Sequence, residues 1–158
     1  MPVFKTERRV RHKPAEMFDL VADVEKYPEF VPLCQQLRVR RRVNAGDGGI
    51  EILVTDMTVA YKVLRETFAS RVTLDRPRLH ILAEYLDGPF SRLENHWRFA
   101  ADGADATLVS FSIDYEFRSR ALALVMGAVF DAAFRRFTDA FEARADAVYG
   151  PPGQATGP

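Results

Sequence analysis

The residue types that most often carry out chemistry are few in this chain and are spread along it. His12, His80 and His96 are the three histidines, and none belongs to an HExxH pattern or has a cysteine at metal-ligand spacing. Cys34, the single cysteine, has no adjacent histidine or lysine that would lower the pKa of its thiol. The glycines after Asp47 read as a hairpin turn, because no strand–GxxxxGK–helix context surrounds them. The sequence therefore predicts no metal site, no catalytic residue and no enzyme activity.

Two polar residues occur on strands whose neighbouring residues are apolar. Asn95 shares a predicted strand face with Leu93 and Trp97, so its amide is expected to point inward. There it can act as a polar anchor for a ligand carbonyl, or it can satisfy backbone groups at a β-bulge. The ring of Tyr115 is expected to lie in the same interior, where its hydroxyl needs a hydrogen-bond partner.

One basic cluster stands out in the chain. Arg38, Arg40 and Arg42 alternate with other residues and are expected on one face of a strand, where they can join the arginines at positions 8 to 11. The cluster is interpreted as a solvated face that protects a sheet edge from aggregation. The functional alternative is contact with anionic lipid headgroups or with ribosomal RNA. Zero net charge leaves this alternative open, because charged patches act locally.

Composition limits the class of protein. A chain of 158 residues has the length of one domain, and a hydrophobic content of 47% is enough for a core. The 22 basic and 22 acidic residues balance, so no DNA partner is expected. A single cysteine fits a reducing compartment, and the N-terminus lacks the apolar region of a signal peptide. The apolar run 121–130 is too short to span a membrane. We therefore expect a cytoplasmic protein, at most peripheral to the inner membrane.

Helix signals occur near the two ends of the chain. Pro14 opens a first short helix, and Pro28 and Pro32 keep a second helical segment short. The long helix is predicted at 119–148, with Ser119 as its N-cap. Its first half is apolar on all sides, which indicates burial on several sides or contact with an apolar partner. Its second half has a single apolar stripe at helical spacing.

Strand signals fill the rest of the chain. Seven strands are predicted at 3–10, 37–43, 50–61, 66–74, 79–86, 90–99 and 109–117. Short turns join the last six strands, so these are expected to be antiparallel neighbours with one polar face. The fold class is therefore α+β, with a curved sheet of about seven strands around a long C-terminal helix and two short helices after the first strand. Residues 1–150 are expected to form a single domain and 151–158 a disordered tail.

Local motifs add a family resemblance to this interpretation. The chain resembles the coenzyme Q-binding protein and RatA ribosome-association toxin family, a START-like helix-grip group related to polyketide cyclases. One departure from the family pattern is Ala69, where the family often has threonine. The motifs that carry the resemblance, over residues 3–150, are Phe18–Cys34 (FDLVADVEKYPEFVPLC), Ser70-Arg71-Val72, Asp87–Phe90 (DGPF) followed by Trp97 and Phe99, Phe111–Phe117, and Phe141–Ala145 (FEARA) with Tyr149.

The resemblance implies a non-enzymatic carrier or chaperone for ubiquinone or a similar polyprenyl lipid that supports respiration. It implies no cofactor apart from this bound lipid. An alternative that it leaves open is a toxin-like protein that binds the large ribosomal subunit. A third alternative is an enzyme of the cyclase or aromatase kind, which would need an inward acid–base pair that the sequence does not offer.

The lipid is predicted to lie between the sheet and the long helix. The segment from Tyr27 to Leu33, with Phe30 between them, is expected to form a lid or a membrane-touching mouth. The predicted wall residues from the sheet are Trp97, Phe99, Val109, Phe111, Ile113 and Tyr115. The predicted wall residues from the long helix are Leu122, Met126, Val129, Phe130 and Ala133.

Overall fold

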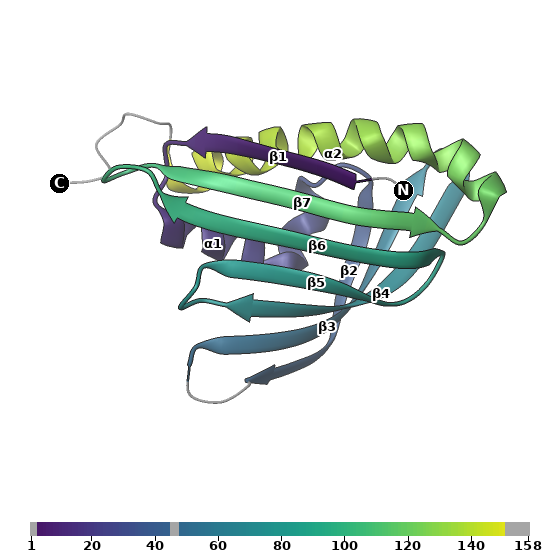
Figure 1. Ribbon diagram of the computed structural model, residues 1–158, viewed down its shortest axis with the longest axis horizontal. Coiled ribbons are helices and arrows are strands. Elements are labelled where there is room, and N and C mark those ends of the chain that lie inside the picture. Colours follow the sequence, from purple (N-terminus) through teal and green to yellow (C-terminus); the bar gives the residue numbers. More distant parts are fainter. Residues whose placement is uncertain (1–2, 45–47, 151–158) are drawn as a thin grey trace.

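The computed structural model describes residues 3–44 and 48–150, which form one antiparallel sheet, two α-helices and one 3-10 helix (Figure 1). The helices are α1 (Pro14–Ala22), η1 (Val24–Glu29, the 3-10 helix) and α2 (Arg120–Tyr149). The strands are β1 (Val3–Val10), β2 (Cys34–Asn44), β3 (Ile50–Tyr61), β4 (Leu64–Asp75), β5 (His80–Asp87), β6 (Phe90–Ala101) and β7 (Thr107–Phe117). The predicted α+β class and order of elements are confirmed. The predicted tail, 151–158, lies outside the described residues.

The seven strands follow the order β1-β7-β6-β5-β4-β3-β2 across the sheet, and all neighbours are antiparallel. The strands from β2 to β7 lie side by side in chain order because short turns connect them. β1 instead pairs with β7, the last strand, with Phe4 opposite Ile113. The sheet curves along one side of α2, so its concave face and the helix form the two layers of the fold (Figure 1).

The 30-residue helix α2 begins and ends as its sequence predicts. The hydroxyl of Ser119 accepts a hydrogen bond from the Leu122 amide at 3.2 Å, and Gly150 has a positive φ of 95° at the C-cap. The first half of α2 is not buried on several sides, because Leu124 and Val125 are 86% and 54% exposed. No helix within the described residues has both the length and the apolar character that crossing a membrane requires.

The two short helices lie at one end of the layers. Pro14 occupies the first turn of α1, where its missing amide proton is not needed. The helix packs against β5, β6 and the end of α2, where the Tyr149 hydroxyl donates to the Glu16 carbonyl at 3.1 Å. η1 follows directly and packs against β2. The position of η1 matters for the site, because it lies at the edge of the space between sheet and helix.

A bulge in the edge strand β2 changes which residues share a face. The register shifts between Val39 and Arg41, so that Arg38 lies opposite Asp56 but Arg42 lies opposite Leu53. Directly opposed residues share a face of the sheet. Leu53 is buried in the core on the concave side, so Arg42 lies on the other face from Arg38. The predicted single face of Arg38, Arg40 and Arg42 is therefore wrong, because the extra residue of the bulge reverses the alternation.

Candidate ligand-binding cavity

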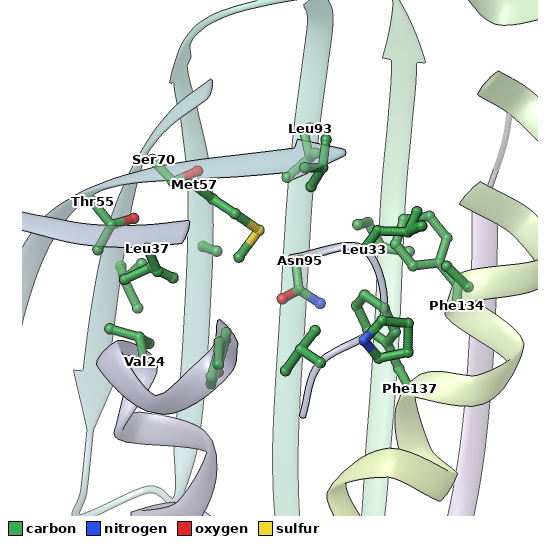
Figure 2. Close-up of a pocket in the computed structure, with 18 of the residues that line it drawn as sticks. Val24, Leu33, Leu37, Thr55, Met57, Ser70, Leu93, Asn95, Phe134 and Phe137 are labelled. Carbon is green, nitrogen blue, oxygen red and sulfur yellow. The ribbon is translucent and has the colours of Figure 1, made fainter. Parts of the chain in front are cut away.

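A largely apolar cavity lies between the concave face of the sheet and α2, and its volume is about 110 Å³ (Figure 2). Residues from η1, from strands β2 to β7 and from α2 form its wall. Side chains of both layers meet there because every second residue of each strand points towards the helix. A cavity of roughly 150 Å³ accepts benzene, so the free space is close to the size of one six-membered ring.

The sheet contributes some of its predicted wall residues and not others. Those that line the cavity are Trp97, Phe111 and Ile113. Phe99, Val109 and Tyr115 are buried on the same face but do not line it. Phe99 packs edge-on against Phe18 of α1 at 6.0 Å, and Tyr115 packs against Phe134 of α2 at 5.3 Å. On β7 the wall is limited to Phe111 and Ile113 in the middle of the strand, and the three other residues pack in the core beside the cavity.

The helix wall also differs from the predicted one. The α2 residues that line the cavity are Phe130, Ala133, Phe134, Phe137 and Phe141. Leu122, Met126 and Val129 were predicted to join them but lie outside, nearer the helix start. Met126 is fully buried, and Leu122 and Val129 pack at the edge of the core. The cavity therefore faces the end of the apolar first half, at Phe130, and the apolar stripe of the second half.

Several wall residues from strands β2 to β5 were missed by the sequence analysis. They include Leu37, Thr55, Met57, Ser70 and Ala83. Their strands have less regular alternation than β7, and two of the five residues are polar. A usable signal was present in β3, where Thr55, Met57 and Val59 fall at every second position.

The predicted mouth segment lies over the cavity. Tyr27 and Leu33 line the cavity, whereas Phe30 lies just outside it. Phe30 and Tyr27 pack edge-on against Phe141 of α2, with ring centres 5.0 Å and 5.4 Å from it. Burial raises the pKa of Tyr27, whose hydroxyl donates to the Val21 carbonyl. Aromatic contacts between η1 and α2 therefore close this side of the cavity.

Three polar side chains interrupt the apolar wall. Thr55 and Ser70 lie directly opposite each other on β3 and β4 and point into the cavity (Figure 2). Asn95 of β6 also lines it, and its Nδ2 donates to the backbone carbonyl of Ser112 at 2.8 Å. The amide of Asn95 thus satisfies a backbone group and lines the cavity at the same time. The expected β-bulge is not found at Asn95, because the register of β6 against β7 shifts only between Phe90 and Arg92.

The other chemically capable residues lie away from the cavity. Burial raises the pKa of the Cys34 thiol to about 11, and a hydrogen bond to the Gln36 backbone opposes this effect. The rings of His80 and His96 stack on neighbouring strands, with Nε2 of His80 2.9 Å from Nδ1 of His96. The other ring nitrogen of His96, Nε2, lies 2.9 Å from the carboxylate of Glu94. Histidines, cysteine and carboxylates do not gather into a metal-binding group within 3–44 and 48–150.

The basic cluster of β2 is largely neutralised by acidic neighbours. Arg40 pairs with Asp56 at 2.8 Å. Arg42 pairs with Glu51 at 3.1 Å and with Glu25 of η1 at 3.3 Å. The cluster therefore links the edge strand to its neighbour and to η1, which weakens its use as a positive patch.

Comparisons with known proteins agree with this geometry. A family model described as polyketide cyclase / dehydrase and lipid transport matches residues 10–142. The ribosome association toxin RatA of Escherichia coli K12 is 31% identical over 153 residues, which are 94% of this chain and 90% of that protein. The mitochondrial coenzyme Q-binding protein coq10 of Schizosaccharomyces pombe is 31% identical over 118 residues, 74% of this chain and 70% of that protein.

A solved structure shares both sequence and fold with this chain. The 18 kDa protein CC1736 from Caulobacter crescentus, determined in solution, is 36% identical and has a TM-score of 0.77. The match covers 95% of this chain and 99% of that one. The structure of a START superfamily protein from Mycobacterium smegmatis, which is 18% identical over 92% of this chain and 98% of that one, has the same fold with a TM-score of 0.76, so the predicted helix-grip fold is confirmed.

Proposed function

The chain belongs to the polyketide cyclase / dehydrase and lipid transport family, and from this membership we propose that it is a non-enzymatic carrier for ubiquinone or a similar polyprenyl lipid that supports respiratory electron transport. The observation that carries the proposal is the cavity between sheet and α2. Its wall is aromatic and aliphatic apart from Thr55, Ser70 and Asn95. A concave apolar site with a few polar groups is typical of small-molecule recognition. The fission-yeast relative is named as a coenzyme Q-binding protein, which supports the choice of lipid.

The size of the cavity assigns different places to the two parts of such a lipid. At about 110 Å³ the space suits the ring and little of the tail. A polyprenyl tail then leaves through the side closed by η1, where Tyr27 and Leu33 line the wall. Each buried methylene contributes about 0.8 kcal/mol, so the first prenyl units add affinity as they pass the aromatic residues of α2. Entry of the ring requires η1 to move away from Phe141.

A surface suited to contact with a bilayer lies at the start of α2, separate from the side at η1 and Phe141 where the tail leaves. Leu124 and Val125 are among the most exposed large apolar side chains of the described residues. Arg120 is also exposed and lies four residues before Leu124, so the two share one face of the helix. An apolar side chain beside a cation suits the interface of a membrane with anionic headgroups. We assign contact with an anionic bilayer to this face rather than to Phe30, which packs inward on Phe141.

The scarcity of acid–base groups in the wall supports a binding role over catalysis, since the hydroxyl of Tyr27, which lines the cavity, already donates to the Val21 carbonyl. Among the described residues that line the cavity there is no histidine, carboxylate, lysine or arginine. An enzyme of the cyclase or aromatase kind would need such a group within hydrogen-bond reach of its substrate. The family also contains cyclases by its description, so the fold alone does not decide the matter.

A second candidate function is binding to the large ribosomal subunit. It is favoured by the 31% identity to the ribosome association toxin over nearly the whole chain. The arginines of β2 that would contact RNA are partly used in ion pairs, namely Arg40 with Asp56 and Arg42 with Glu51. Such pairing reduces the positive potential available to phosphates, which is why the lipid carrier is preferred.

Native extraction tests the proposed carrier function. The protein is purified gently from a quinone-containing host, extracted with organic solvent, and the extract is examined by mass spectrometry. A polyprenyl quinone is expected in stoichiometric amount. An extract without lipid, from protein that sediments with the large ribosomal subunit, would contradict the carrier and support the second candidate.

A further inference from the structure

The amide of Asn95 has a fixed orientation in the wall of the cavity. Its contact at 2.8 Å is with the backbone carbonyl of Ser112, which can only accept a hydrogen bond. The atom nearest that carbonyl is therefore Nδ2, and the amide oxygen Oδ1 is turned the other way. In Figure 2 this oxygen points into the cavity, towards the side on which Met57 and Val24 lie.

No side chain or backbone donor within the described residues reaches this oxygen. The hydrogen bond to Ser112 is the one that Asn95 makes there through its side chain. The surrounding wall offers aromatic and aliphatic groups, including Leu93 and Ile113 on the adjoining strand positions. An acceptor in apolar surroundings is unfavourable unless it receives a donor. The donor has to come from the bound molecule or from water that the molecule displaces.

The other two polar groups do not impose the same demand. Thr55 and Ser70 are 3% and 5% exposed and face each other on β3 and β4. A similar pair of hydroxyls on the same two strands, Thr58 and Thr67, forms a hydrogen bond at 2.8 Å, with either oxygen able to donate. A hydroxyl can donate or accept, so Thr55 and Ser70 adapt to a carbonyl or to a hydroxyl of a ligand. Oδ1 of Asn95 can only accept, which makes it the selective group of the cavity.

We infer that the cavity selects a ring that carries a hydroxyl group over one whose oxygens are all carbonyls or ethers. This inference rests on the proposed function, for which it means that the hydroquinone form of the lipid binds more tightly than the quinone. A quinone carbonyl can use the remaining N–H of Asn95 but leaves Oδ1 without a donor. A phenolic hydroxyl donates to Oδ1 and accepts from the same N–H. The protein itself transfers no electron in this scheme.

Anaerobic titration calorimetry tests the selection directly. The probes are a short-tailed alkyl benzoquinone, the hydroquinone obtained by reducing it, and the dimethyl ether of that hydroquinone. The hydroquinone is expected to bind about tenfold more tightly than the quinone, which corresponds to about 1.4 kcal/mol. The dimethyl ether cannot donate and is expected to gain no advantage over the quinone. This comparison uses the unaltered chain, so it does not depend on the folding of any variant.

Two variants locate the effect. Asn95→Leu is expected to bind both redox forms with equal affinity, whereas Asn44→Leu, at an exposed position at the end of β2 and outside the cavity, is expected to keep the preference for the hydroquinone. Circular dichroism establishes that each variant is folded. Equal binding of the three probes to the unaltered chain, tighter binding of the quinone, or a preference that survives Asn95→Leu would each overturn the inference and leave the carrier function standing. Failure of every probe to bind the unaltered chain would overturn both.

Discussion

The guanidinium group of Arg144 lies 5.0 Å from the centre of the Phe30 ring and forms a cation–π contact with it. Its Nη2 also contacts the carboxylate of Glu29 at 2.8 Å. One residue of α2 thus holds two consecutive residues at the end of η1, the segment that closes the cavity. Phe141, one turn earlier on α2, packs edge-on against Phe30 with ring centres 5.0 Å apart. We interpret these contacts of Arg144 as a latch, which holds the end of η1 closed over the cavity.

Loss of this latch is expected to speed ligand exchange. In Arg144→Ala the lid loses a cation–π contact worth roughly 0.5–2 kcal/mol. Opening then becomes easier, and stopped-flow measurements should show lipid association and dissociation faster by roughly twofold to thirtyfold. Arg136→Ala, at an exposed position of the same helix, is the control and should leave both rates unchanged. Equal rates in the two variants would show that η1 does not gate the cavity.

Filling the cavity from α2 is expected to weaken binding and preserve the fold. Ala133 is 3% exposed and lines the cavity, so Ala133→Leu places its side chain in the free space. The affinity for the lipid should fall by about tenfold or more, while the free energy of unfolding changes by less than about 1.5 kcal/mol. Ala132→Leu is the matched control, because Ala132 is exposed on the same turn. Undiminished binding by Ala133→Leu would place the ligand elsewhere.

The turn between β5 and β6 requires a glycine for two independent reasons. Gly88 has a φ of 142°, and a Cβ there would lie 2.6 Å from the Cβ of Phe68. Gly88→Ala is therefore expected to lower the free energy of unfolding by at least about 2 kcal/mol. Gly127→Ala, in the middle of α2 with open space around it, should instead raise it by about 1 kcal/mol. Urea denaturation measures both changes, and a neutral Gly88→Ala would contradict the tight contact.

Stability is expected to decrease at alkaline pH partly through Cys34. Burial raises the pKa of its thiol from 9.0 to about 11, so the folded chain holds the proton more tightly than the unfolded chain. The contribution is fully present below pH 9 and is lost as the pH rises towards 11. The raised pKa of Tyr27 acts in the same direction at higher pH. Urea midpoints from pH 8 upward should fall more gently in Cys34→Ala, and parallel profiles would exclude Cys34 as a source.

Contact with a bilayer is expected to depend on the start of α2. Leu124→Asp combined with Val125→Asp should reduce binding to anionic vesicles by about tenfold or more, because charge replaces apolar surface that would enter the interface. Val148→Asp is the control, since Val148 is 52% exposed near the other end of the helix. Vesicle co-sedimentation measures the difference. The double variant adds two negative charges and the control adds one. A loss in Val148→Asp of half the size or more, on a logarithmic scale, would mean that binding follows the added charge and not this surface.

Local patterns in the sequence determined the elements and their order. The alternation in β7, the proline at the start of α1 and the cap at Ser119 each depend on neighbouring residues, so they can be read without the fold. Short turns also determined the antiparallel neighbours from β2 to β7. The motifs that resemble the family predicted the helix-grip architecture, and the structure has this architecture.

Tertiary structure decided where the cavity lies and which side chains serve it. Tyr115 and Phe111 alternate identically in β7, yet only Phe111 lines the cavity. The rings of Phe117, Phe130 and Phe134 surround Tyr115, and these contacts come from tertiary packing that no periodicity contains. The bulge that turns Arg42 towards Glu25 depends on the pairing of β2 with β3. The orientation of Asn95 depends on the carbonyl of Ser112, 17 residues away in the chain. Such contacts join distant residues, so their geometry exists only in the folded chain.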